Sequence, residues 1–156
     1  MMALKEGKMC DTTEQAIHMV LKEKKAYWQF LSADNIEEMN GKRNGIKLPI
    51  SAINLFFSFQ EQRKRGNLNK RGIIRWQNCF ITECNFIWHS KKMELWITGF
   101  EKDFPFRDPD YTGAILVLVK DEGDSYQGFI LNTEDSMEEF MDIVGVCPVE
   151  TGIIKF

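Results

Sequence analysis

Short runs of apolar and aromatic residues, separated by polar turns, recur along most of the chain and predict strands more often than helices. Val, Ile, Phe, Trp and Tyr are the residue types that favour strands. The run from Ala114 to Val119 contains no polar residue, which is typical of a buried strand. The predicted strands are residues 26–31, 46–48, 73–76, 79–82, 86–88, 93–100, 114–119 and 126–131, with 153–154 as a closing strand.

Apolar residues at helical spacing occur in only three short segments. Each begins near a side chain that can accept a hydrogen bond from the free backbone N–H groups of a first helical turn. The segments and their capping residues are 12–25 with Asp11 and Glu14, 52–57 with Ser51, and a helix that opens at Ser136 and Glu139 and ends at Gly145. The polar stretch 32–45 and the basic stretch 60–72 lack this spacing and are predicted to be long loops.

The order of these elements decides the fold class. Helices do not separate the strands, so a parallel α/β fold with crossover helices is excluded. Strands 86–88 and 93–100 flank His89-Ser90-Lys91-Lys92 and predict a hairpin with a basic tip. We expect a single α+β domain over residues 1–156, with an N-terminal helix region at 1–25. It is mostly β, with seven or eight short strands in a barrel-like sheet and about three short helices.

The composition is that of an ordinary globular domain, with 44% apolar and 28% charged residues over 156 positions. No apolar run approaches the roughly 18 to 20 residues of a membrane-spanning helix, and the N-terminus lacks the apolar core of a secretory signal. We therefore expect a cytoplasmic protein with no membrane partner. Cys10, Cys79, Cys84 and Cys147 form no C-x-x-C pair, which predicts reduced, mostly buried thiols, no metal site and no cofactor.

Basic residues crowd into the middle third of the chain. Residues 41–92 contain eleven basic and two acidic residues, a net charge of +9, whereas the rest of the chain carries 9 basic and 21 acidic residues, or −12. Aromatic residues lie between these charges, at Trp76, Phe80, Phe86 and Trp88. A basic block interleaved with aromatic rings is the pattern expected of a nucleic-acid-binding surface.

A catalytic site finds little support in the sequence. A metal-dependent nuclease would pair a Pro-Asp with a downstream Asp/Glu-x-Lys, whose carboxylates hold magnesium. Pro109-Asp110 is present, but the downstream Lys120 lacks the carboxylate two residues before it, and Glu23-Lys24-Lys25 lies upstream. His89 sits in the predicted hairpin tip, which suits an exposed residue better than a base in a dry pocket. We therefore predict a binding domain and not an enzyme.

An ordered set of short blocks resembles a known family. The blocks are Leu31-Ser32-Ala33, residues 41–49 ending in apolar-x-apolar-Pro, Ile97-Thr98, and Pro105 to Gly113 (P-x-x-D-P-x-x-T-G) before the apolar strand 114–119. In this order they resemble the N-terminal effector DNA-binding domain of EcoRII-type restriction endonucleases. The resemblance covers roughly residues 26–156, and the first helix matches loosely.

The resemblance implies a pseudobarrel related to the plant B-three DNA-binding domain, which grips the major groove of double-stranded DNA with two arms. The target of the best-known members is CCWGG, where W is A or T. Cleavage in that family belongs to a separate C-terminal nuclease domain, which this chain lacks. We therefore expect the target-recognition or effector module of a type II restriction endonuclease.

By position, the resemblance places the N-terminal arm in the loop 32–47 and the C-terminal arm in the hairpin 88–96. The positions that match the family's contacts are Lys42, Lys47, Lys92 and Glu94. The chain departs from the family directly after Glu94, where it has Leu95 and Trp96 in place of two basic residues.

The chemistry of these residue types suits base reading. Lys and Arg donate to guanine O6 and N7, Glu accepts from cytosine N4, and Asn bridges adenine N6 and N7. Arg43, Lys91 or Lys92 would therefore read guanine, and Glu94 would read cytosine. The predicted DNA-binding residues are Lys42, Arg43, Asn44, Lys47, His89, Ser90, Lys91, Lys92 and Glu94. The predicted phosphate contacts are Arg63, Lys64, Arg65, Lys70 and Arg71.

Three alternatives stay open. The chain could bind single-stranded nucleic acid or RNA, with Trp and Phe as stacking platforms. It could also be a protein-interaction domain whose basic face meets an acidic partner. Glu94 itself could be an ordinary exposed strand residue that pairs with Lys92.

Overall fold

The computed structural model describes residues 12–23, 25–145 and 152–154, which contain eight strands, five α-helices and two 3-10 turns. The strands are β1 (Ala26–Phe30), β2 (Gly45–Leu48), β3 (Leu68–Trp76), β4 (Ile81–His89), β5 (Glu94–Thr98), β6 (Ile115–Lys120), β7 (Ser125–Leu131) and β8 (Gly152–Ile154). The helices are α1 (Thr12–Glu23), α2 (Ala33–Met39), α3 (Ile53–Phe56), α4 (Phe59–Gln62) and α5 (Glu134–Val144), with 3-10 turns at Ile50–Ala52 and Pro109–Tyr111. The predicted α+β, mostly β domain is confirmed, with more helices than expected.

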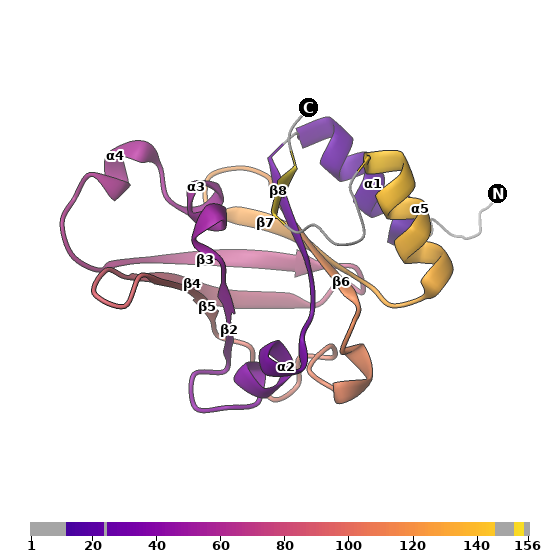
Figure 1. Ribbon diagram of the computed structural model, residues 1–156, viewed down its shortest axis with the longest axis horizontal. Helices are drawn as coiled ribbons and strands as arrows, with labels where there is room; N and C mark the ends of the chain where they lie inside the picture. Colours follow the sequence, from indigo (N-terminus) through magenta and orange to yellow (C-terminus); the bar gives the residue numbers. More distant parts are fainter. Residues whose placement is uncertain (1–11, 24, 146–151, 155–156) are drawn as a thin grey trace.

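The strands form one curled sheet in the order β2-β5-β4-β3-β7-β6-β1-β8. Neighbours are antiparallel except β3 and β7, which run parallel with Ile73 opposite Ser125. The sheet bends so far that β1 and β6 cross β3 and β4 at a steep angle (Figure 1). Within the described residues its end strands, β2 and β8, do not pair with each other. The sheet is therefore a pseudobarrel, curled but open.

Aromatic side chains fill the inside of this curl. Phe56 of α3, Phe86 of β4 and Tyr126 of β7 lie with ring centroids 4.7 to 5.3 Å apart. The short helix α3 therefore closes one end of the curl, because its Phe56 ring packs between Phe86 of β4 and Tyr126 of β7. Such contacts add to the burial of the rings themselves.

A second core lies on the opposite side of β1 and β6, where α1 and α5 pack side by side (Figure 1). Val20 of α1 and Phe140 of α5 are buried there with Trp28 and Val117 of the sheet. Strand β6 is therefore buried on both faces, one toward each core, which explains its unbroken apolar sequence and confirms the predicted buried strand.

The prediction of a loop over residues 32–45 is wrong, because helix α2 occupies its first half. Ser32 Oγ accepts from the backbone N–H of Asn35 at 3.1 Å, and Asn35 Oδ1 accepts from the Ser32 N–H at 3.1 Å. Ile36 and Met39, three residues apart, are buried beneath the helix. An Asn in place of the usual Glu or Gln completes the capping box, so the usual sequence signature is missing.

The basic loop is also shorter than predicted. Residues 59–62 form α4, capped by Ser58, and β3 already begins at Leu68, so the loop is confined to residues 63–67. The two predicted strands 79–82 and 86–88 are one strand, β4, which pairs with both β3 and β5. Pairing with β3 runs without a break through residues 83–85 and keeps the chain extended between the two apolar runs.

Two of the predicted helix caps are wrong. Ser51 lies within a 3-10 turn, and α3 begins after Ala52 without a side-chain cap. Helix α5 is capped by Thr133, whose Oγ1 accepts from the Ser136 backbone N–H at 3.1 Å. The predicted end of α5 is confirmed, since Gly145 has a φ of 84° that favours glycine. The predicted cap Asp11 lies outside the described residues.

Of the cysteines, Cys84 is buried and Cys79 is exposed, and both are free thiols. Cys10 and Cys147 lie outside the described residues. No helix in the described ranges is long and apolar enough to span a membrane.

Candidate nucleic-acid interface

The two predicted arms lie on neighbouring strands of the sheet. Lys47 of β2 stands opposite Trp96 of β5, and Glu94 of β5 stands opposite His89 of β4. The turn at residues 90–93 joins β4 to β5, so the predicted hairpin with a basic tip is confirmed. Lys47, His89 and Glu94 therefore lie on three neighbouring strands of one sheet.

Strand alternation places these side chains on the solvent side. Leu95 and Ile97 of β5 are buried, whereas Glu94 and Trp96, which alternate with them, are only partly covered. Lys47 is exposed between two buried residues of β2 in the same way. We call this solvent side of β2, β5, β4 and β3 the outer face. Its side chains include Lys47, Asn69, Arg71, Glu83, Asn85, Ile87, His89, Glu94, Trp96 and Thr98.

Trp96 lies at the centre of a polar group on the outer face. The guanidinium carbon of Arg43 is 4.4 Å from the centre of the Trp96 ring. The Trp96 Nε1–H donates to Glu94 Oε1 at 3.2 Å, and Glu94 Oε2 is 3.6 Å from Lys47 Nζ. Arg43 Nη1 also lies 3.4 Å from His89 Nε2. We call these five residues the Trp96 cluster.

Glu94 is held in its charged form. The hydrogen bond from Trp96 keeps the pKa of Glu94 below its ordinary value, and the charges of Lys47 and Lys92 act in the same direction. Its side chain is 26% exposed, and its ion-pair partner is Lys47, not Lys92 as the alternative had it. Glu94 therefore presents a carboxylate acceptor on a face flanked by cations.

The remaining arm residues surround this cluster without joining it. Lys42 is exposed in the turn between α2 and β2, and Lys91 and Lys92 are exposed in the hairpin tip. Asn44 adopts a φ of 48°, and its carbonyl accepts from the backbone N–H of Gly99 and Phe100 at 3.0 and 2.7 Å. The Asn44 backbone thus fixes the start of β2 against the end of β5, while its side chain is exposed.

Helix α2 holds the other side of β2. Glu38 Oε1 accepts from the Lys47 backbone N–H and from Asn35 Nδ2, both at 3.1 Å. The first half of the segment predicted to be a loop is therefore a helix that supports the strand carrying Lys47.

The basic loop reaches the hairpin tip through a single polar side chain. Asn67 Oδ1 accepts from the Ser90 backbone N–H at 2.9 Å. The exposed residues Arg63, Lys64 and Arg65 lie just before Asn67, separated from it by Gly66. Two basic segments more than twenty residues apart in sequence are thus joined at one end of the sheet, where α4 projects (Figure 1).

Lys70 and Arg71, both predicted phosphate contacts, lie on opposite faces of β3. Arg71 points to the outer face, where its Nη2 is 3.6 Å from Glu83 Oε1 and both side chains are largely exposed. Lys70 points inward, with its side chain 18% exposed. The structure therefore brings Arg71, but not Lys70, to the side that carries the Trp96 cluster.

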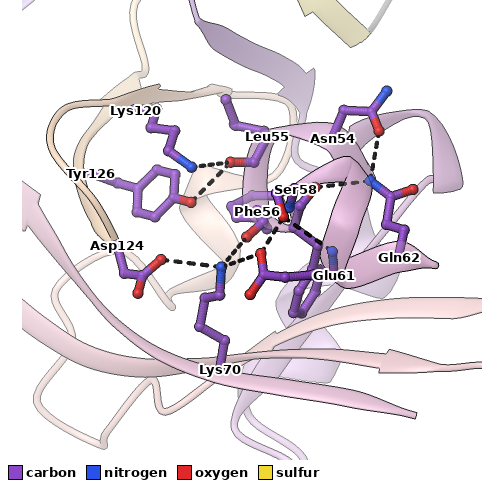
Figure 2. Close-up of polar contacts among 11 residues, drawn as sticks. Asn54, Leu55, Phe56, Ser58, Glu61, Gln62, Lys70, Lys120, Asp124 and Tyr126 are labelled. Carbon is purple, nitrogen blue, oxygen red and sulfur yellow. Dashed lines mark hydrogen bonds and ion pairs between the residues drawn. The ribbon is translucent and has the colours of Figure 1, made fainter. Parts of the chain in front are cut away.

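Lys70 is instead the centre of an internal polar group. Its Nζ is 2.7 Å from Glu61 Oε1, 3.3 Å from Asp124 Oδ1 and 3.1 Å from the Phe56 carbonyl (Figure 2). The hydrogen bond from Lys70 keeps the pKa of Glu61 below its ordinary value of 4.5. These contacts tie α3 and α4 to the inner side of β3, and so fix the start of the loop that bears Arg63 to Arg65.

The neighbouring Leu55 carbonyl is satisfied in a similar way. Tyr126 Oη donates to it at 2.9 Å and Lys120 Nζ at 3.3 Å (Figure 2). Carbonyls in the last turn of a helix lack helical donors, and here side chains from β6 and β7 supply them. Burial raises the pKa of the Tyr126 hydroxyl and lowers that of the Lys120 amine.

The aromatic residues within the basic block belong to the core. Trp76 and Phe86 are buried, and Phe80 and Trp88 pack against the inner cluster. They are therefore not free platforms for stacked bases. Among the tryptophans of the chain, Trp96 is the one on the outer face, and Arg43 covers its ring.

Pro109-Asp110, the half-match to a nuclease motif, lies in a 3-10 turn. The Asp110 backbone N–H donates to Asp108 Oδ1 at 2.9 Å, as expected of turn residues. In the described ranges, no group of three or more His, Cys, Asp or Glu side chains is placed to hold a metal ion.

Sequence reasoning missed the residues that organise this surface. Trp96 follows Glu94 by two positions, so strand alternation could have placed it on the same face. Asn67, Asp124 and Tyr126 carry no such signal, because their partners are 23 to 71 residues away in sequence.

No family model matches the sequence, and no curated protein matches it. Among solved structures, the chain is similar to the B3 domain of the UbaLAI restriction endonuclease, whose structure contains cognate DNA. The identity is 13%, the match covers 85% of this chain and 87% of that one, and the TM-score is 0.49. That DNA is the cognate DNA of the UbaLAI domain.

Proposed function

We propose that this chain is a sequence-specific double-stranded DNA-binding module, the target-recognition or effector part of a type II restriction endonuclease with a CCWGG-like site. It would enter the major groove with the β4–β5 hairpin and the adjoining end of β2. A two-stranded ribbon fits that groove, and its donors and acceptors distinguish all four base pairs. The restriction-enzyme context and the site sequence come from the family resemblance.

One observation carries the proposal: the Trp96 cluster holds cationic donors and one ionised acceptor together on an open sheet face. Glu94 offers the acceptor that cytosine N4 requires, and Arg43 offers the donors that guanine O6 and N7 require. A carboxylate among cations would weaken binding to any phosphate backbone, so its presence favours base reading over charge attraction alone. The exposed cations of the 63–65 loop and of the hairpin tip then supply phosphate contacts.

The single-strand and RNA alternative is less favoured, because the rings that it would need are core residues. A protein-interaction domain remains a distinguishable outcome of the experiment.

Fluorescence anisotropy tests the proposal with a CCWGG duplex, duplexes changed at one base pair, the single strands and the matching RNA. We expect the duplex to bind most tightly and single changes to weaken it by about tenfold each. If a selection from random duplexes enriches another site, the module stands and the CCWGG assignment fails. Equal affinity for every duplex rejects sequence-specific recognition, preference for single strands supports the alternative, and no binding to any nucleic acid favours a protein partner.

Glu94→Ala sharpens the test. It should lose discrimination at one cytosine by about tenfold or more. Glu83→Ala is the matched control, because Glu83 is an exposed carboxylate of the same face. It should leave every base preference unchanged. If Glu94→Ala and Glu83→Ala changed affinity and base preference equally, Glu94 would contribute only its negative charge and would not read a base.

A further inference from the structure

Trp96 makes two contacts of different kinds, one through its face and one through its edge. The Arg43 guanidinium lies over the face at 4.4 Å, and the ring N–H donates to Glu94 Oε1 at 3.2 Å. The ring is itself fixed, because it is partly buried in β5 and is flanked by Lys47 of β2 and Ile87 of β4. The Trp96 indole therefore determines where the Arg43 guanidinium and the Glu94 carboxylate lie.

Such an arrangement lowers the entropic cost of binding DNA. Long side chains lose rotamer freedom when they engage a base, and a group that is already held loses less. Arg also suits stacking on an aromatic face, since its planar guanidinium keeps its edge free for bidentate hydrogen bonds. His89 Nε2, 3.4 Å from Arg43 Nη1, defines the direction in which that edge points.

The carboxylate is held in a complementary way. Trp96 occupies one lone-pair direction of Glu94 Oε1, and Lys47 is a looser partner of Oε2 at 3.6 Å. A carboxylate offers about four acceptor directions, so directions remain for a cytosine amino group. The exposed side chain of Lys47 can move to a phosphate without breaking the bond from Trp96.

We infer that Trp96 is a specificity-determining positioning residue, which holds Arg43 and Glu94 as a donor–acceptor pair for one G·C base pair. Arg43 donates to guanine O6 and N7 while Glu94 accepts from the N4 amino group of the paired cytosine. The major-groove edge of a G·C pair presents these acceptors and this donor side by side. The inference deepens the proposed function and rests on it.

Two substitutions separate the two contacts. Trp96→Phe keeps an aromatic face for Arg43 and removes the N–H that holds Glu94, whereas Trp96→Leu removes both. Ile87→Leu, at the residue directly opposite Trp96 in β4, is the control for a repacked outer face. Circular dichroism and thermal unfolding confirm that each variant is folded.

The readout is the ratio of affinities for the preferred duplex and its one-base variants, with affinity for random duplex measured beside it. We expect Trp96→Phe to lower the affinity ratio at the cytosine position by about tenfold and to keep the ratio at the guanine position. Trp96→Leu should lose both, and neither variant should change random-duplex affinity or its salt dependence.

The outcomes separate this inference from the proposed function. The wild-type panel decides the function: if wild type shows no base preference, both fail. If wild type discriminates but the Trp96 variants keep their ratios, or weaken all duplexes alike, the positioning role of Trp96 is overturned while the function stands. The positioning role would also be overturned if Trp96→Phe lost discrimination at guanine and kept discrimination at cytosine. Phe keeps the aromatic face that holds Arg43 and lacks the N–H that holds Glu94, so the inference predicts the opposite result.

Discussion

Substituting Lys70 with Met tests whether the internal polar group stabilises the fold and positions the basic loop. Lys70 Nζ contacts Glu61, Asp124 and the Phe56 carbonyl at 2.7, 3.3 and 3.1 Å (Figure 2). Met preserves most of the side-chain volume and its contact with the inner core. The substitution therefore removes the charge and the three donors while changing the packing little.

The magnitude follows from how far the group is buried. Breaking a fully buried ion pair costs about 3–5 kcal/mol, and breaking an exposed one costs less than about 1 kcal/mol. The Lys70 side chain is 18% exposed, while Glu61 and Asp124 are 34% and 45% exposed, so water screens the carboxylates that are left. We expect a loss of about 1–2 kcal/mol, or roughly 2–8 °C in the melting temperature of a domain of this size.

Thermal unfolding at several pH values is the assay, with Lys64→Met as the control. Lys64 is exposed in the neighbouring loop, so the control removes the same charge without the contacts. The hydrogen bond from Lys70 lowers the pKa of Glu61 in the folded protein below its ordinary value of 4.5. The stability that ionised Glu61 contributes is therefore fully present above pH 4.5, and it is lost as the pH falls through the pKa of Glu61 in the folded protein. The difference between wild type and Lys70→Met should therefore shrink below about pH 4.

Two results would refute this reasoning. One is a melting temperature for Lys70→Met that equals that of Lys64→Met at pH 7. The other is a difference from wild type that stays constant down to pH 3, which would mean that ionised Glu61 does not contribute. If the anchor also positions the loop, Lys70→Met should weaken DNA binding evenly across duplexes and preserve base preferences.

Two further predictions concern the strand that carries Lys47 and the loop cations. Gly45→Ala should destabilise the fold by about 1–3 kcal/mol, because a Cβ there would overlap the Ile97 carbonyl and come within 2.9 Å of Thr98 Cα. Gly41→Ala, where the nearest atom is 3.3 Å away, should cost less, and equal melting temperatures for the two would contradict this account. Arg65→Ala should weaken all duplexes alike and lower the slope of log affinity against log salt by about 1; an unchanged slope would remove Arg65 from the phosphate contacts.

Local patterns were sufficient to predict most of the strands. The run 114–119 and the hairpin around residues 89–92 are visible in the sequence, because alternation and turn residues act over a few positions. Helix α2 escaped prediction since its cap uses Asn35 and only two of its buried residues, Ile36 and Met39, are apolar. The first part of β3 was also missed, because pairing with β4, and not its own polar sequence, holds it extended.

The candidate site shows the same division. The sequence and the resemblance pointed to the segments around Lys47 and Glu94. In the structure Lys47 Nζ lies 3.6 Å from Glu94 Oε2. Their relation depends on the register of β2 against β5, which no local pattern specifies. Asn67 was hidden for the same reason, since its partner lies 23 residues away in the hairpin.

The net charge of the middle segment overstates the charge that is available to a ligand. Several of its cations already face carboxylates: Lys47 faces Glu94, Lys70 faces Glu61 and Asp124, and Arg71 faces Glu83. The exposed cations at residues 63–65 and 91–92 lie at the loop and the hairpin tip, outside the Trp96 cluster. Attraction to phosphate and discrimination between bases would therefore depend on different residues. Substitutions in the loop should change affinity and its salt dependence, and those in the Trp96 cluster should change base preference, because the two sets share no side chain.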